Sequence, residues 1–153
     1  MLVIDRISIC APLDRVFAAA RDIEQWPRIL PHYRWVRVLE GRTDLDGIVE
    51  MAAWRPFGPL GYPTWWVSHM TVDRSTHAIH YRHIRGITRG MDVVWSLTPS
   101  EVGVDLTIVH RWGGPPWPLV GGAVADLVIG PVFIHGIASL TLAGIKRHTE
   151  EGA

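Results

Sequence analysis

The segment Tyr62-Pro63-Thr64-Trp65-Trp66-Val67-Ser68-His69-Met70-Thr71-Val72 is the densest aromatic stretch in the middle of the chain. Its aromatic and β-branched residues predict a strand, in which successive side chains point to opposite faces. One face would carry Trp66, Ser68, Met70 and Val72. The opposite face would carry Trp65, Val67, His69 and Thr71. We expect the face that carries Trp66 to line a small-molecule pocket.

The charge and cysteine content of the 153 residues limit the classes of function. Lys plus Arg and Asp plus Glu number 15 each, so there is no net field to attract nucleic acid or an anionic membrane. Cys10 is the only cysteine, which excludes an internal disulfide framework and fits a reducing cytoplasm. The amino terminus shows no basic leader followed by an apolar run. We therefore expect a single cytoplasmic ligand-binding domain over residues 1–153.

Eight tryptophans are the most informative feature of the composition. Tryptophan is large and usually needs a hydrogen-bond partner for its N–H group. Eight of them in a chain of this size indicate an aromatic-lined cavity, an apolar interface or a tryptophan-rich core. Composition alone does not separate these alternatives.

The amino-terminal third predicts one strand and two short helices. A strand over residues 2–10 stops at Ala11-Pro12, and Pro12 suits the first turn of a helix. The buried stripe of that helix would carry Val16, Phe17 and Ala20.

The second short helix would begin at Asp22, with Gln25 three residues later completing a capping box. It would end at Trp26–Pro31, because Pro27 and Pro31 have no amide donor and restrict the residue before each of them.

Residues 33–112 predict a run of strands joined by hairpin turns. The expected strands are 33–40, 48–55, 65–72, 77–84, 91–97 and 104–112. Asp46-Gly47 marks the first hairpin turn, and Pro56–Pro63 is expected to be an apolar loop that gates a ligand. Short neighbouring strands of this kind predict an α+β fold, with an antiparallel sheet that curves strongly if it closes on a helix.

Residues Leu119 to Ile145 are mostly apolar, with one carboxylate, Asp126, and one imidazole, His135. The length could span a bilayer, but glycines interrupt the segment and no basic cluster precedes it. A helix that is apolar nearly all round is expected to lie inside a protein. We expect no stable membrane insertion but a long C-terminal helix, kinked near Gly130-Pro131, on the concave side of the sheet. Its second face would contact a loop or a partner subunit, which makes this region a candidate homodimer interface.

The histidines do not predict a metal site. On a strand, His77 and His83 share a face about 20 Å apart while His80 points away, so one ion cannot hold all three. Ser68 and His69 face opposite sides and cannot form a nucleophile and base. Nucleotide-binding and nucleophile-elbow motifs are also absent. We expect no metal and no cofactor.

Strand alternation instead brings apolar and a few polar side chains to one inner face. The inward positions of the last two strands would be Val93, Trp95, Leu106, Ile108, His110 and Trp112. The polar groups of the cavity would come from Ser68 and His110, with Tyr33 and Arg55 as further candidates. Such a cavity suits a flat, largely apolar ligand with a few oxygens. The alternative for His110 is a hydrogen-bonded histidine of the core.

Several short motifs spread over nearly the whole chain resemble those of one known family. They are Ala11-Pro12, Val16-Phe17, Asp22-Ile23-Glu24-Gln25-Trp26-Pro27, Tyr33, Arg55-Pro56, Trp66-Val67-Ser68-His69 and Trp95, followed by the long terminal helix. The chain resembles the START-like (SRPBCC, helix-grip) superfamily, and within it the polyketide aromatase/cyclase (polyketide cyclase/dehydrase) branch. Trp-Pro is shared widely across the superfamily, whereas Trp-Val-Ser-His is narrower and indicates the branch.

The resemblance implies a seven-stranded antiparallel sheet that grips the C-terminal helix, with a pocket between them. In that family the pocket folds a poly-β-ketone chain and promotes aldol ring closure and dehydration. The matching pocket positions are Trp26, Tyr33, Trp66, Ser68 and Trp95. The next inward position departs from the aromatase pattern, because Met70 stands where that pattern has an arginine. A thioether cannot donate a proton or stabilise an oxyanion.

Two hypotheses of function follow. The first is an aromatase/cyclase or dehydratase whose acid–base residues are Tyr33, Ser68, Arg55 or His110. The second is a non-catalytic carrier of a quinone, a lipid or another apolar molecule, which Met70 favours because it makes the pocket wall soft and apolar. A third alternative is a structural protein that uses its apolar tail as an interface. The expected ligand-binding residues are Trp26, Trp54, Trp66, Met70, Val93, Trp95, Ile108 and Trp112.

Overall fold

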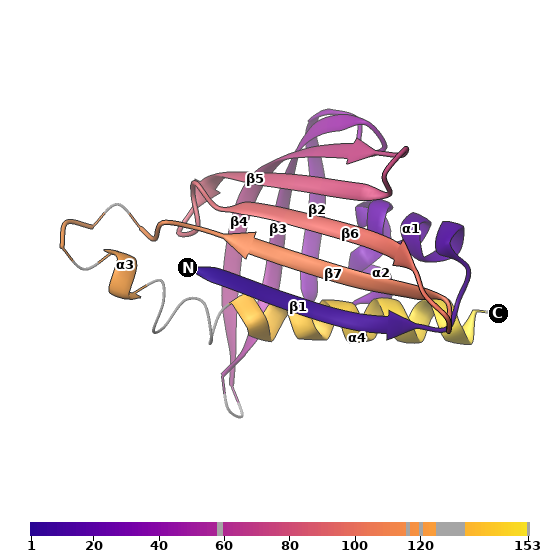
Figure 1. The fold of residues 1–153 in the computed structure, drawn as a ribbon. Helices are drawn as coiled ribbons and strands as arrows, with labels where there is room; N and C mark the ends of the chain where they lie inside the picture. Colours follow the sequence, from indigo (N-terminus) through magenta and orange to yellow (C-terminus); the bar gives the residue numbers. More distant parts are fainter. Residues whose placement is uncertain (58–59, 116, 120, 125–133, 153) are drawn as a thin grey trace.

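The computed structural model describes residues 1–57, 60–115, 117–119, 121–124 and 134–152 (Figure 1). Its centre is a seven-stranded antiparallel sheet with the strand order β1-β7-β6-β5-β4-β3-β2. The strands are β1 (Leu2–Ile9), β2 (Tyr33–Gly41), β3 (Asp46–Phe57), β4 (Leu60–Asp73), β5 (Ala78–Gly86), β6 (Asp92–Pro99) and β7 (Val104–Arg111). Strands β2 to β7 follow one another as a meander, and β1 pairs with β7.

A long helix lies against the concave side of this curved sheet (Figure 1). This helix, α4 (His135–Glu151), contacts β1, β3 and α1 (Leu13–Arg21). Two short helical segments, η1 (Ile23–Gln25) and α2 (Trp26–Ile29), connect α1 to β2. The arrangement confirms the predicted α+β helix-grip fold.

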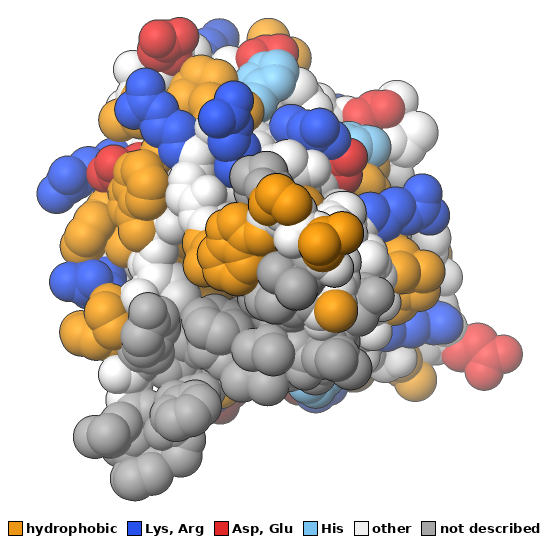
Figure 2. Space-filling model, turned by 90° about the vertical axis from the view of Figure 1, so that its left-hand side faces the viewer, with side chains coloured by type: hydrophobic (Ala, Val, Ile, Leu, Met, Phe, Trp, Pro, Cys, Tyr) orange, Lys and Arg blue, Asp and Glu red, His pale blue; other side chains and the backbone are white. Residues whose placement is uncertain are grey.

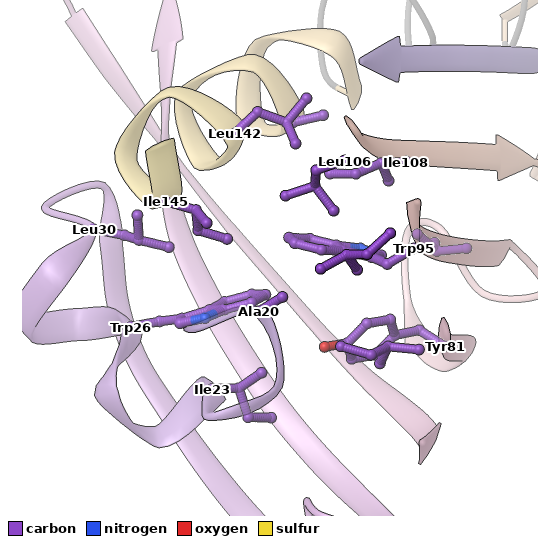
Figure 3. Packing of buried hydrophobic residues seen from close by; sticks show 14 of the residues in the cluster. Ala20, Ile23, Trp26, Leu30, Tyr81, Trp95, Leu106, Ile108, Leu142 and Ile145 are labelled. Atoms are coloured by element: carbon purple, nitrogen blue, oxygen red, sulfur yellow. The ribbon is translucent and has the colours of Figure 1, made fainter. Parts of the chain in front are cut away.

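The inner face of the sheet is set by strand alternation. In β6, Val93, Trp95 and Leu97 are buried, and the residues between them are more exposed. β5 and β7 alternate in the same way, as expected for a sheet that packs one face on a helix. Figure 3 shows Leu142 and Ile145 of α4 facing Leu106, Ile108 and Trp95 across the core.

The first helix agrees with its prediction, and the second does not. α1 follows Pro12 and buries Val16, Phe17 and Ala20. The predicted capping box was wrong, because Asp22 makes no side-chain capping hydrogen bond. Pro27 does not end a helix but lies in the first turn of α2. Proline is tolerated there because the amides of a first turn have no partner within the helix.

The apolar loop predicted at Pro56–Pro63 is largely a hairpin extension. β3 continues to Phe57 and β4 begins at Leu60, with Pro56 opposite Gly61. β5 pairs with β4 only from Trp66 onward, so the first residues of β4 have a neighbouring strand on one side only. Proline fits such an edge because its missing N–H group need not face a strand. The ribbon formed by these residues projects past α4 (Figure 1).

The first hairpin turn is also displaced from its predicted place. Asp46 and Gly47 already belong to β3, with Gly47 opposite Gly41 of β2. The turn itself lies at residues 42–45.

The C-terminal segment departs from its prediction at its first residue. Leu119 has a φ of 69°, a value outside the right-handed helical region, so a helix does not start there. α3 (Gly121–Val124) is a single short helix, and α4 runs from His135 to Glu151, past the predicted end. Asp126 and the predicted kink at Gly130-Pro131 lie outside the described residues. No helix in the described part of the chain is long and apolar enough to cross a membrane.

Polar contacts fasten α4 to β1 and to the residue after it. Near the start of the helix, the imidazole Nδ1 of His135 and Oδ1 of the buried Asp5 form a hydrogen bond. Towards the end of the helix, the Lys146 ammonium donates to the carbonyl of Ser8 at 2.9 Å. Glu150 accepts from the amide of Cys10 at 2.8 Å. The helix is therefore held to the edge strand of the sheet at both ends.

Candidate functional site

A cavity lies between the inner face of the sheet and the first turns of α4. The side of the molecule on which α4 begins faces the viewer in Figure 2. It contains about 720 Å³ free of protein atoms, part of it open to solvent. The lining residues are Trp26, Tyr33, Met51, Thr64, Trp65, Trp66, Tyr81, His83, Ile87, Thr88, Val93, Trp95, Ile108, His110, Ile134, Ile137, Ala138 and Thr141. They come from α2, α4 and the residue before it, six strands, and the turn between β5 and β6.

Six aromatic rings form a continuous belt along the cavity. In order of contact they are His83, Trp66, Tyr33, Trp26, Trp95 and Tyr81, and neighbouring ring centroids lie 5.0–6.5 Å apart. Two of the contacts, His83–Trp66 and Trp26–Trp95, are stacked and the others are edge-to-face, and both are favourable orientations for aromatic rings. The belt gives the cavity flat apolar walls that match a flat ligand.

Trp26 is the central ring of this belt. Its indole Nε1 donates a hydrogen bond to the carbonyl of Ala19 in α1, at 3.0 Å. The ring stacks on Trp95 at 5.4 Å between centroids and meets Tyr33 edge-on at 5.0 Å. Trp26 therefore connects the helical segment after β1 to strand β6 of the sheet. Figure 3 shows Trp26 and Trp95 facing each other in the core.

The two tyrosines of the belt keep their protons. Burial raises the pKa of Tyr33, and a hydrogen bond with Thr141 acts in the opposite direction. Burial also raises the pKa of Tyr81 well above its ordinary value, and the neighbouring Tyr33 raises it further. The hydroxyl of Tyr81 is buried and has no hydrogen-bond partner. Both phenols are therefore neutral hydrogen-bond donors.

The two cavity histidines are uncharged at neutral pH. Burial lowers the pKa of His83 to about 4, with Asp92 acting in the opposite direction. Burial, and then the nearby His83, lower the pKa of His110 to about 3. The Nδ1 atom of His83 lies 2.6 Å from the hydroxyl of Thr88. The Nδ1 atom of His110 is buried without a partner, so the alternative of a hydrogen-bonded core histidine does not describe this atom.

The structure brings seven of the predicted site residues together around the cavity. They are Trp26, Tyr33, Trp66, Val93, Trp95, Ile108 and His110. Four of them, Val93, Trp95, Ile108 and His110, share the inner face through the period-two alternation of β6 and β7.

Other predicted site residues do not line the cavity. Ser68 and Met70 are fully buried in the sheet layer, and the Ser68 hydroxyl has no hydrogen-bond partner. Trp54 lies on the outer face, because the buried Ala53 beside it takes the inward position, and the guanidinium of Arg34 covers its ring at 4.6 Å. Trp112 is buried and donates to the carbonyl of Arg89. The side chain of Arg55 lies outside the described part of the structure.

Several lining residues were not predicted. Trp65, which we expected on the opposite face, takes part in the lining although it is 40% exposed. Tyr81 and His83 could have been found from the alternation of β5, which buries every second residue from Ile79 to His83. The residues of α4, among them Ala138 and Thr141, could not, because they depend on where the helix begins.

The described lining contains no lysine, arginine, aspartate or glutamate. Within the described residues there is also no group of three or more His, Cys, Asp or Glu side chains placed to hold a metal ion. The chemistry available to the described lining is therefore hydrogen bonding and proton exchange by neutral phenols, imidazoles and hydroxyls.

The buried histidines predict a loss of stability in mild acid. Their folded-state pKa values are about 4 for His83 and about 3 for His110, whereas both titrate near 6.5 when unfolded. Between pH 6.5 and 5 the unfolded chain therefore binds more protons than the folded chain. We expect the free energy of unfolding to fall by about 1–2 kcal/mol per histidine over this range.

Urea unfolding at pH 6.5 and pH 5 measures this loss. His83→Gln should make the pH dependence shallower than in the unchanged protein. His80→Gln, at an exposed position of the same strand, is the matched control and should keep the original dependence. An equal loss in all three proteins would contradict the assignment to His83.

Comparison with known proteins identifies the family. A family model described as polyketide cyclase/dehydrase and lipid transport matches residues 9–133 of this chain. The chain belongs to this family. Among relatives in the polyketide cyclase/dehydrase family, a Streptomyces halstedii protein named "Putative polyketide cyclase" is 29% identical over 109 residues. The alignment covers 71% of this chain and 94% of the relative.

Solved structures share the fold of this polyketide cyclase/dehydrase family member. The Zhui aromatase/cyclase of Streptomyces sp. R1128 superposes with a TM-score of 0.72 at 18% identity, covering 97% of this chain and 94% of that protein. A START superfamily protein from Mycobacterium smegmatis superposes with a TM-score of 0.71 at 14% identity, covering 99% of both chains. At these identities the likeness concerns the fold, and it confirms the START-like architecture.

Proposed function

We propose that this protein binds an apolar, aromatic or polyketide-like molecule in the cavity and promotes its cyclisation and dehydration. The observation that carries the proposal is the belt of six aromatic rings along a cavity whose described lining bears no charged side chain. Flat apolar walls with a few polar groups are what a flat ligand with several oxygens requires. Membership of the polyketide cyclase/dehydrase family supports the same class of ligand.

The polar lining offers the two groups that an aldol ring closure needs. A base removes a proton from a carbon beside a carbonyl, and the resulting enolate attacks a second carbonyl whose oxygen must be polarised. The neutral imidazole of His110 would accept the proton, and the phenol of Tyr33 would donate to the attacked oxygen. After the imidazolium of His110 returns its proton to the phenolate of Tyr33, dehydration repeats the exchange: His110 would accept a second proton, from the carbon between the carbonyl and the alcohol, and Tyr33 would donate one to the hydroxyl, which leaves as water while a C=C bond forms. Ser68 and Arg55 remain secondary candidates for acid–base work.

The second candidate function is that of a non-catalytic carrier of a quinone or lipid. Met70 favours it, because this residue stands where the aromatase pattern has an arginine and is itself fully buried. The described lining supplies no cation in its place.

Ligand binding is tested by closing the cavity from α4. Ala138 is 5% exposed and lines the cavity, so Ala138→Phe would place a ring in the ligand's space. We expect 1,4-naphthoquinone to quench the tryptophan fluorescence of the unchanged protein. Ala138→Phe should weaken its binding at least about tenfold, because the new ring takes up apolar surface that the ligand would otherwise bury.

Ser139→Phe is the matched control, because it adds the same side chain to an exposed position of the same helix. It should bind the quinone as the unchanged protein does. A protein that shows no quenching, or equal binding by both variants, would remove the cavity as the ligand site.

The enzyme and the carrier are separated by Tyr33→Phe. We expect this change to lower the rate of ring closure of a synthetic poly-β-ketone by about 100-fold, the usual contribution of a positioned proton donor. Quinone binding should stay within a factor of three, since the ring remains. Chromatography of the products measures the rate. If the unchanged protein binds the quinone but forms no cyclised product, the carrier is the better description.

A further inference from the structure

Two polar atoms of the cavity have no hydrogen-bond partner within the protein. They are the hydroxyl oxygen of Tyr81 and the Nδ1 atom of His110. The Tyr81 residue is only 6% exposed, and both residues line the cavity. A buried polar group that lacks a partner is costly and rare in folded proteins, so a pair of them facing one cavity requires an explanation.

The strand register places these two residues in one row across the sheet. Tyr81 of β5 lies opposite Val93 of β6, and Val93 lies opposite His110 of β7. All three side chains belong to the inner face and line the cavity. Because neighbouring strands lie about 4.8 Å apart, the backbones of Tyr81 and His110 are separated by about 10 Å. In this row, two side chains that carry a polar atom flank the apolar Val93.

His83 is close to this row but does not belong to the pair. Its Nδ1 atom is already engaged with the Thr88 hydroxyl at 2.6 Å. Its ring stacks on Trp66, with the ring planes 10° apart. The imidazole of His83 is therefore held by the protein, whereas Nδ1 of His110 is left for a ligand.

We propose that Tyr81 and His110 determine the specificity of the cavity by binding two oxygens of an uncharged aromatic ligand. The inference rests on the proposed binding function of the same cavity and adds the class of ligand to it. Tyr81 donates its O–H to a carbonyl or hydroxyl oxygen at one end. A hydroxyl or carbonyl at the other end pairs with His110 Nδ1, as donor or acceptor according to the tautomer. Ligands that carry a carboxylate are rejected.

The rejection of carboxylates follows from the charges around the row. No described lining residue is a lysine or arginine. Burial lowers the pKa of both cavity histidines to about 4 or below, so neither becomes a cation near neutral pH. A carboxylate in the cavity would lose its hydration without gaining a counter-charge, which is strongly unfavourable.

The test compares three probes of nearly the same shape at pH 7 by calorimetry. They are 2,6-dihydroxynaphthalene, naphthalene and naphthalene-2-carboxylate. We expect the diol to bind most tightly and the carboxylate at least about tenfold more weakly than the diol, since an unpaired buried charge costs more than an unpaired neutral group. Tyr81→Phe and His110→Leu should each weaken diol binding by about 3- to 10-fold, the worth of one net hydrogen bond.

Naphthalene serves as the control ligand for both variants, because it has no oxygen to pair with Tyr81 or His110 and its affinity should not fall in either variant. His110→Asn should keep more of the diol preference than His110→Leu, because its amide retains hydrogen-bonding atoms near the Nδ1 position. Tyr81→Phe removes an oxygen that has no partner, so the variant is expected to fold at least as stably as the unchanged protein.

Each outcome separates the specificity from the binding function. Equal affinities for the three probes, or tightest binding of the carboxylate, would overturn the specificity and leave the cavity as a ligand site. Diol binding that is unaffected by both Tyr81→Phe and His110→Leu would do the same. If the unchanged protein binds neither naphthalene nor the diol, the proposed binding function fails, and the inference fails with it.

Discussion

Met70→Arg is expected to destabilise the folded protein by about 3–5 kcal/mol, the cost of a buried charge without a partner. Met70 is 0% exposed, and its neighbours across the strands are Gly47 and Tyr81, neither of which is acidic. The buried carboxylate among the described residues is Asp5, on β1, and it already bonds His135. The guanidinium would therefore find no counter-charge in this part of the sheet.

Urea unfolding followed by tryptophan fluorescence measures the effect. Met70→Leu is the matched control, because it keeps the volume and polarity, and it should cost less than about 1.5 kcal/mol. An arginine variant as stable as the leucine variant would show that this position can reach the cavity or solvent. If such a variant also cyclised a poly-β-ketone faster than the unchanged protein, an arginine at position 70 would perform the catalytic role that the aromatase pattern assigns to it.

Trp26→Ala should cost about 3–5 kcal/mol, the range for removing a large buried aromatic side chain. Trp26 is 1% exposed, and its contacts reach both sides of the cavity. The substitution removes the stack on Trp95 and the hydrogen bond to Ala19 together. It also joins the vacated volume to the ligand cavity, so quinone affinity should fall with stability.

Two further variants locate the cause of this loss. Trp26→Phe keeps a ring against Trp95 but removes the indole N–H. We expect its free energy of unfolding to lie between that of the unchanged protein and that of Trp26→Ala. Trp117→Ala removes a tryptophan that is 48% exposed and should change the free energy of unfolding by less than about 0.5 kcal/mol. Similar losses for Trp26→Ala and Trp117→Ala would contradict a structural role for the belt.

The fold could be predicted because several signals in the sequence agree. The alternation around Trp66 and Trp95 gives the inner face of the sheet, and the motifs near Trp26 and Tyr33 indicate the family. The errors arose where a local rule has an exception that depends on tertiary context. Pro27 was expected to end a helix but lies in a first turn, and Pro56 was expected in a loop but occupies an edge of the β3–β4 ribbon.

The cavity was harder to predict than the fold, because its walls depend on register and on the start of α4. Alternation assigns a residue to a face, but it does not say which residues of neighbouring strands stand side by side. The row of Tyr81, Val93 and His110 is fixed by pairing of β5, β6 and β7. Met70 shows the converse case, since a residue can be on the inward face and still be covered by its neighbours.

The pairing of β1 with β7 has a consequence for synthesis on the ribosome. Leu2 pairs with Arg111, and Ile9 pairs with Val104, so β1 must wait for its partner until β7 has been synthesised. At about 5–20 residues per second, β1 remains without its partner strand for on the order of 5–20 s. Leu2 and Ile4 stay more than half exposed even in the finished fold. The nascent chain therefore presents an unpaired apolar strand to chaperones and neighbouring chains until β7 has been synthesised.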